Sequence, residues 1–233
     1  MQFSNKYIEF CLDEPTSVFK GLSQKEKETI VQNHKIYHIK KGRPIFREGE
    51  KPHGLICIAS GKVKLFREGV GGRNQILKMK KPLDIFGFRA LFGDQSWYMS
   101  AEAVEDTTIC MLEKSPFVKI LKKNADLSFL FVKLLSEELQ FANNRIISLT
   151  QKHVRGRIAE SILMLCDVYG FEEDGKTIGV YLSREDIANL SSMTTSNAIR
   201  TLSNFVSDGI ISIKGRKITL IDQSAMEQIS KNG

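Results

Sequence analysis

The sequence has little cysteine, and its cysteines are scattered. The four include no Cys-x-x-Cys pair, whereas zinc and iron–sulfur sites usually draw their ligands from closely spaced pairs. We therefore expect Cys11, Cys57, Cys110 and Cys166 to be reduced thiols, mostly buried, and we expect no metal site.

Long apolar runs and catalytic motifs are missing as well. No window approaches the ~20 consecutive apolar residues of a membrane helix, and the first residues lack the charged region and apolar stretch of a signal peptide. The patterns His-Glu-x-x-His, Gly-x-x-x-x-Gly-Lys and Gly-x-Ser-x-Gly do not occur. These absences predict a cytoplasmic protein that neither enters a membrane nor acts as an enzyme.

The residues that are present fit a folded protein with an anionic partner. The 233 residues are 42% hydrophobic, enough for one large domain or two small ones. Lysine and arginine number 34 against 27 aspartates and glutamates, and this net charge of +7 hints at nucleic acid. The excess lies in residues 1–154, with 25 cations against 17 anions, so total charge does not locate the nucleic-acid site.

Residues 36–111 have the pattern of antiparallel β structure. Twelve glycines and prolines over about fifty residues separate short alternating runs such as Val63–Arg67 and Gln75–Met79. Between these two runs, Gly69-Val-Gly-Gly72 is typical of a hairpin loop, since glycine tolerates positive φ. The pattern predicts a compact β-roll or barrel.

A long helix is expected next, because residues 125–152 contain neither glycine nor proline. A helix of this length favours a coiled coil between two copies of the chain over packing within one chain. A second apolar face, formed by Leu127, Phe131, Leu134 and Phe141, suits packing on the β-roll. The expected dimer seam, at spacings of three and four, comprises Val132, Leu135, Leu139, Ala142, Ile146 and Leu149.

A break near residues 153–156 separates this helix from a C-terminal block. The block begins with a helix over 157–169, an acidic turn at 172–175 and a short strand over 177–182. The segment that follows carries the clearest functional signal.

Two short helices joined by a turn are predicted after this strand. Ser183 and Asp186 form a capping box for a first helix that runs to about Leu190. Thr194 is a good N-cap for a second helix, which ends at Gly209, where a left-handed residue is favoured.

The second helix divides into an apolar face and a polar face. A polar face with one cation, small hydroxyls, amides and no carboxylate suits the major groove, where side chains approach base acceptors and phosphates. We expect the apolar face to be buried: Ala198, Ile199, Leu202, Phe205 and Val206. The polar face comprises Ser196, Asn197, Arg200, Ser203, Asn204 and Ser207.

A hairpin with a cationic tip follows directly. The runs Ile210–Ile213 and Ile218–Ile221 flank the turn Lys214-Gly-Arg-Lys217, as in a wing that binds phosphate while a helix contacts bases. Amphipathic helices alone are common, but helix, turn, helix and wing in this order indicate a winged helix-turn-helix. The expected DNA contacts are Ser183, Arg184, Thr194, Thr195, Ser196, Asn197, Arg200, Lys214, Arg216 and Lys217.

These segments resemble the Crp–Fnr transcription regulators. The motifs that carry the resemblance are Leu182–Ala188, Met193–Arg200 and Leu202–Ile211 for the helix-turn-helix, His153–Ala159 for the hinge, and Gly42–Gly49, Gly61–Val63 and Asp84–Gly87 for the β-roll. The resemblance implies an α+β fold, with an N-terminal antiparallel β-roll like the cyclic-nucleotide-binding jelly roll, a long dimerisation helix and a C-terminal winged helix-turn-helix.

The same resemblance implies a function. It describes a homodimeric, sequence-specific regulator that binds a near-palindromic operator in double-stranded DNA and activates transcription by contacting RNA polymerase. A small effector in the β-roll would control it. The expected domains are the β-roll sensor with flanking helices (1–124), the dimerisation helix (125–152) and the winged helix-turn-helix (153–233).

The β-roll departs from family members that bind cyclic AMP. Those members typically carry Gly-Glu-Leu, whose Glu holds the ribose, and later Arg-Ser, whose Arg pairs with the cyclic phosphate. Here these positions read Gly87-Phe-Arg89 and Trp97-Tyr-Met99, and the Thr-Ser that meets adenine becomes Ala142-Asn143. We therefore do not expect cyclic AMP to bind in the usual way. The expected effector pocket, which its own apolar side chains could also fill, comprises Gly87, Phe88, Arg89, Trp97, Tyr98, Met99, Ala142 and Asn143.

Two alternative functions stay open. A haem-dependent redox or gas sensor of the same family would need an axial ligand, for which His34, His38, His53 and Cys57 are candidates. A cyclic-nucleotide-type regulatory module without DNA binding is the alternative from another class. The iron–sulfur cluster of the Fnr branch is not expected, because Cys11 stands alone at the N-terminus.

The recognition helix departs from the family as well. Many members have Arg-Glu near its start and Arg four residues later, whereas this chain has Thr195-Ser196 and keeps Arg200. Arg200 can still bond guanine O6 and N7. We therefore expect an operator that differs from the well-known half-site.

Overall fold

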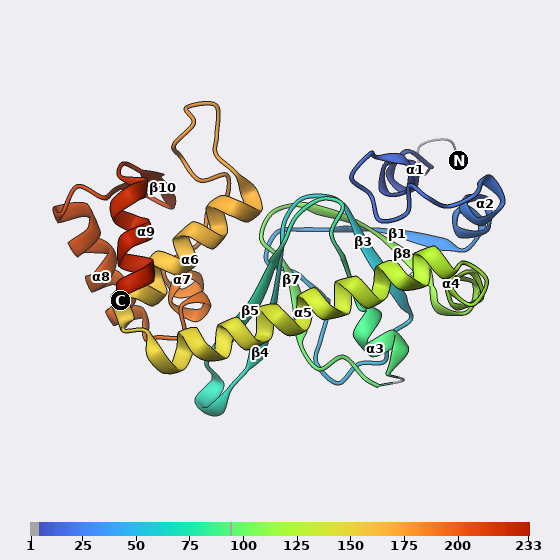
Figure 1. The fold of residues 1–233 in the computed structure, drawn as a ribbon, viewed down its shortest axis with the longest axis horizontal. Coiled ribbons are helices and arrows are strands. Elements are labelled where there is room, and N and C mark those ends of the chain that lie inside the picture. Colours follow the sequence, from blue (N-terminus) through green and yellow to red (C-terminus); the bar gives the residue numbers. More distant parts are fainter. Residues whose placement is uncertain (1–4, 94) are drawn as a thin grey trace. The chain divides into compact units, whose positions relative to one another are not determined.

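The computed structural model describes residues 5–93 and 95–233, which form two compact units (Figure 1). The first unit comprises the described chain up to Arg67 together with Lys80–Gln140, and the second comprises Glu68–Met79 together with Phe141–Gly233. Among these described residues, no helix combines the length and the apolar character needed to cross a membrane.

Two four-stranded sheets form the β-roll, and their recorded strand pairs are antiparallel, which confirms the predicted class. The first sheet has the order β1-β8-β3-β6, with strands His34–Ile39, Thr107–Glu113, Gly54–Ser60 and Ile85–Phe86. The second has the order β2-β7-β4-β5, with strands Pro44–Phe46, Ser100–Ala103, Val63–Glu68 and Asn74–Lys80. The predicted hairpin loop between β4 and β5 contains the short helix η1 (Val70–Gly72), with Gly71 at a φ of +76°.

One hydrophobic core joins the first sheet to the surrounding helices. Alternate residues of β3, such as Leu55 and Cys57, point to this core, as the two-residue period of a strand dictates. Rings from separate helices meet there edge to face, including Phe117 with Phe131 at 5.6 Å between centroids. The helices that contribute are α1 (Asn5–Asp13), α2 (Gln24–Gln32), α3 (Phe88–Phe92), α4 (Lys114–Leu121) and the start of α5 (Ala125–Gln151).

Helix α5 is continuous over 27 residues, close to the predicted bounds (Figure 1). Of the face expected to pack on the β-roll, Leu127 and Phe131 are buried and Leu134 is half-buried. The expected dimer seam is exposed apart from Leu149, which is half-buried, and Leu139 retains 64% of its accessible surface. A contiguous exposed apolar stripe of this kind marks an interaction surface.

From residue 154 onward, the C-terminal unit contains four helices and a hairpin. Its elements are α6 (Val154–Tyr169), α7 (Arg184–Leu190), α8 (Thr195–Ser207), β9 (Ile211–Lys214), β10 (Lys217–Leu220) and α9 (Gln223–Asn232). Helix α6 begins three residues earlier than predicted, because His153 is its N-cap and Gly156 is helical. A side chain at position 156 would not fit, since its β-carbon would lie 2.6 Å from the backbone oxygen of Gly233.

The predicted strand over 177–182 is wrong. Only isolated bridges occur there, between Phe171 and Ile178 and between Thr177 and Thr219. The acidic turn explains the irregular path, because the Asp174 carboxylate accepts hydrogen bonds from the Thr177 hydroxyl at 2.5 Å and from the Thr177 backbone N–H at 2.7 Å. These hydrogen bonds lower the pKa of Asp174 to about 2, so the turn stays charged and closed at neutral pH.

Candidate nucleic-acid interface

Helix α7 begins with the capping box that the sequence predicts. The Ser183 hydroxyl donates to the Asp186 carboxylate at 2.7 Å and accepts the Asp186 backbone N–H at 3.0 Å. Arg184 reaches the wing, where its guanidinium donates to the backbone oxygen of Gly215 at 3.0 Å. Both residues, expected as DNA contacts, already have partners in the domain: Ser183 caps α7, and Arg184 connects α7 to the wing.

Helix α8 has the predicted ends and the predicted polar face. The Thr194 hydroxyl accepts the backbone N–H of Asn197 at 3.3 Å, and Gly209 follows the helix with a φ of +71°. Arg200 is exposed, and its guanidinium donates to Asn197 Oδ1 at 3.1 Å. Asn197 is half-buried, whereas the exposed residues are Thr194, Thr195, Ser196, Arg200, Ser203, Asn204 and Ser207.

Two residues expected on the buried face of α8 are exposed. Ile199 retains 47% and Val206 43% of its accessible surface, so their predicted burial is wrong. They lie at the edge of the apolar face, beside a cavity of about 290 Å³ that Ile213 of β9 also lines. Thr201 is buried instead and completes the packed face of the helix.

The wing is a tight hairpin whose tip carries the predicted cations. Strands β9 and β10 pair with Lys214 opposite Lys217, and Gly215 has the positive φ that a two-residue turn requires. Lys214, Arg216 and Lys217 are all exposed. Lys217 forms an ion pair with Glu172 at 3.1 Å, whereas no ion pair is recorded among the described residues for Lys214 or Arg216.

In the β-roll, an aromatic ring lies against Gly87, a residue of the expected effector pocket. Gly87 precedes α3 with a φ of +99°, and a β-carbon on it would lie 2.7 Å from Cη2 of Trp97. Trp97 is buried and stacks on Phe46, with ring centroids 3.9 Å apart and planes 14° apart. The indole therefore fills the space beside Gly87.

The other expected pocket residues divide between core and surface. Phe88 and Met99 are buried, and Phe88 packs edge to face on Phe131. Arg89 is exposed and lies 3.6 Å from the centroid of the Tyr98 ring, and burial of that phenol raises the pKa of Tyr98. Ala142 and Asn143 are exposed and belong to the C-terminal unit.

The candidate haem ligands have varied surroundings. His34 Nδ1 bonds the Val31 backbone oxygen at 2.7 Å, and His38 Nδ1 bonds the Thr108 hydroxyl at 3.0 Å. His53 borders a cavity of about 310 Å³ in the β-roll.

The cysteines are free thiols, as predicted. Cys57 lies opposite Cys110 across β3 and β8, and both pack with Cys11 in the core. Only Cys166 is partly exposed. In residues 5–93 and 95–233, no group of three or more histidine, cysteine or carboxylate side chains could hold a metal ion.

Comparisons with known proteins match both halves of the chain. A family model described as cyclic nucleotide-binding domain matches residues 37–124, and one described as Crp-like helix-turn-helix domain matches residues 156–229. The CRP-like cAMP-activated global transcriptional regulator of Mycobacterium tuberculosis is 24% identical, over 90% of this chain and 94% of the relative. The anaerobic regulatory protein of Bacillus subtilis is 29% identical, over 72% of each chain.

Solved structures share the fold. A transcriptional regulator of the crp/fnr family from Eubacterium rectale superimposes with a TM-score of 0.74 at 20% identity, covering 92% of this chain and 98% of the other. FixK2 from Bradyrhizobium japonicum also superimposes with a TM-score of 0.74, at 22% identity, covering 84% of this chain and 96% of the other.

Proposed function

The chain belongs to the Crp–Fnr family of DNA-binding transcription regulators, and we propose that it acts as a homodimer that binds a near-palindromic operator. The observation that carries this proposal is the exposed, carboxylate-free polar face of α8, followed directly by a wing with a cationic tip. A helix of this kind contacts base edges, while a cationic hairpin contacts phosphate.

In this proposal, three segments of the chain have separate roles. Residues 1–124 would act as the sensor, the helix over 125–152 as the dimer element, and residues 153–233 as the DNA-binding part. The exposed seam of α5 supports the dimer, and a two-fold axis would set two α8 helices about 34 Å apart, one turn of DNA. The residues that would contact DNA are those of α8 and of the wing, foremost Arg200, Lys214 and Arg216.

We further propose that the protein acts in the cytoplasm and controls transcription by contacting RNA polymerase. The relatives are named as transcriptional regulators, and a regulator bound beside a promoter changes transcription by its contact with the polymerase.

Cyclic AMP at 1 mM is expected to leave the melting temperature of this protein unchanged. The Mycobacterium tuberculosis relative is named as cAMP-activated, but here Trp97 lies against Gly87 and the family's anchors are absent. A site with a dissociation constant of about 10 µM would stabilise the protein by about 2.7 kcal/mol at this concentration and raise the melting temperature by roughly 5–10 °C. Differential scanning fluorimetry measures this, and a saturable rise of that size would overturn the expectation.

Selection from random DNA tests the proposed function. The purified protein is incubated with a pool of duplexes carrying a random central segment, and the bound duplexes are sequenced over several rounds. We expect enrichment of one site with two inverted half-sites. Enrichment of no sequence would favour the ligand-binding module that does not bind DNA.

A further inference from the structure

Residues 189–192 comprise the last two residues of α7 and the first two residues of the loop that leads to α8, and this segment is called the turn below. Each of the four residues is hydrogen-bonded to an element outside the helix-turn-helix. The backbone oxygen of Asn189 accepts a hydrogen bond from Gln75 Nε2 of β5 at 2.8 Å. The Ser191 hydroxyl, fully buried, donates to the hydroxyl of Ser161 on α6 at 2.9 Å. The remaining two residues of the turn, Leu190 and Ser192, accept hydrogen bonds from a side chain of α5.

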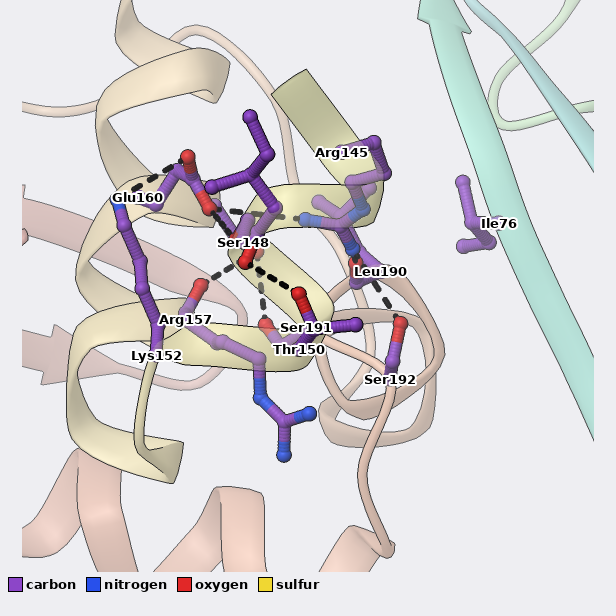
Figure 2. A network of polar contacts seen from close by, with 12 residues as sticks. Ile76, Arg145, Ser148, Thr150, Lys152, Arg157, Glu160, Leu190, Ser191 and Ser192 are labelled. Atoms are coloured by element: carbon purple, nitrogen blue, oxygen red, sulfur yellow. Dashed lines mark hydrogen bonds and ion pairs between the residues drawn. The ribbon is translucent and has the colours of Figure 1, made fainter. Parts of the chain in front are cut away.

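A single arginine near the end of α5 makes both of these bonds. Arg145 Nη2 donates to the backbone oxygen of Leu190 and to the Ser192 hydroxyl, the latter at 3.4 Å (Figure 2). Its side chain is only 21% exposed. A largely buried guanidinium needs such acceptors, because an unbonded cation is costly to remove from water.

A carboxylate on α6 holds this arginine in place. Glu160 lies 3.9 Å from Arg145 Nη1 and 3.2 Å from Lys152 Nζ, and it accepts a hydrogen bond from the Ser148 hydroxyl (Figure 2). Arg145 and Ser148 of the last turns of α5, and Lys152 just after the helix, thus converge on one residue of α6. The end of α5 is anchored, and the guanidinium is directed at the turn.

The turn itself is held in a strained conformation just before the recognition helix. Ser192 has a φ of +56°, a left-handed conformation that residues other than glycine seldom adopt. Such a conformation persists when the surroundings determine it, and here the Ser192 side chain is bonded to Arg145. Thr194, the N-cap of α8, follows two residues later, so the position of the turn sets the start of α8.

We propose that Gln75 and Arg145 are positioning residues that hold the turn 189–192 and thereby set the orientation in which α8 meets DNA. Together they form a turn clamp, with one member on the β4–β5 hairpin and the other on the dimer helix. A displacement of either element reaches the recognition helix through a hydrogen bond to the turn. The inference rests on the proposed DNA-binding function and adds to it the residues through which the sensor half acts.

Selectivity for the operator tests the turn clamp. Dissociation constants are measured by fluorescence anisotropy for the selected duplex and for a scrambled duplex of the same composition. The ratio of the constant for the scrambled duplex to the constant for the selected duplex measures selectivity. We expect Arg145→Met to lower this ratio by about 10-fold or more, and Gln75→Leu to lower it by about 3-fold. Binding to the scrambled duplex should change little, because α8 and the wing keep their cations. Arg145→Lys should restore part of the ratio, because lysine can still donate to the turn.

Lys152→Met is the matched control. It also removes a cation that lies one residue after the end of α5 and pairs with Glu160, but Lys152 has no recorded bond to the turn among the described residues. The ratio should therefore stay within about 2-fold of the wild type. Thermal melts show whether each variant folds. If Arg145→Met does not fold, selectivity is compared for Gln75→Leu and Arg145→Lys instead.

Two results would overturn the clamp: an unchanged ratio in folded variants that lack either clamp residue, or tighter operator binding, which would make the contact inhibitory. Failure of the proposed function has a different signature, namely a wild-type protein with no preference for any duplex.

Discussion

Leu139→Lys is expected to convert the dimer to a monomer and to weaken operator binding by about 100-fold or more. Leu139 lies in the middle of the exposed apolar stripe of α5. In a parallel dimer two lysines would meet in this seam, and a buried unpaired charge destabilises strongly. A monomer loses the gain from binding two half-sites at once, which reaches 10²–10⁴-fold (an order-of-magnitude range).

The matched control for this variant is Gln140→Lys. It adds the same charge to the same helix one residue later, on an exposed position outside the seam. Sedimentation velocity should show a dimer for this control and a monomer for Leu139→Lys. A dimeric Leu139→Lys with full operator affinity would place the dimer contact elsewhere.

Arg200→Ala is expected to cost about 1–3 kcal/mol of operator binding, or roughly 5–150-fold, and to relax the sequence preference at one base pair of each half-site. Arg200 is the cation on the polar face of α8, and its guanidinium is oriented by Asn197 Oδ1. A guanidinium can bond guanine O6 and N7 together, which a methyl group cannot do. Anisotropy titrations with the selected site and its single-base variants measure both effects.

Arg216→Ala provides the contrast to Arg200→Ala. Arg216 lies at the tip of the wing, and loss of a phosphate contact there should weaken the selected and scrambled duplexes by similar factors and lower the salt dependence. Equal losses on both duplexes for Arg200→Ala would instead make Arg200 a phosphate contact.

The parts of the interface that the sequence predicts are those formed by local chemistry. Ser183 with Asp186, Thr194 and Gly209 act within one helical turn, so their spacing alone indicates where α7 and α8 begin and end. The wing is also local, since its two strands pair through a two-residue turn.

The parts that the sequence does not predict depend on contacts between distant segments. Ile199 and Val206 stay exposed because β9 does not cover the edge of α8 on which they lie. Helical periodicity shows which residues share a face, but not how much of that face another element covers. Counting positions shows that the anchors for cyclic AMP are absent, but not that the Trp97 ring lies against Gly87. Gln75 bonds a backbone oxygen 114 residues away, and an acceptor on the backbone leaves no signal in the sequence.

A hydroxyl-radical footprint on the selected operator tests the central claim most directly. The reagent cleaves DNA wherever its backbone is exposed, so the protected positions show where each recognition helix and wing lie. We predict two protected regions related by two-fold symmetry, with centres about 34 Å apart, one helical turn. A single protected region, or uniform cleavage at protein concentrations that bind the DNA, would contradict a dimeric regulator that contacts its operator through α8 and the wing.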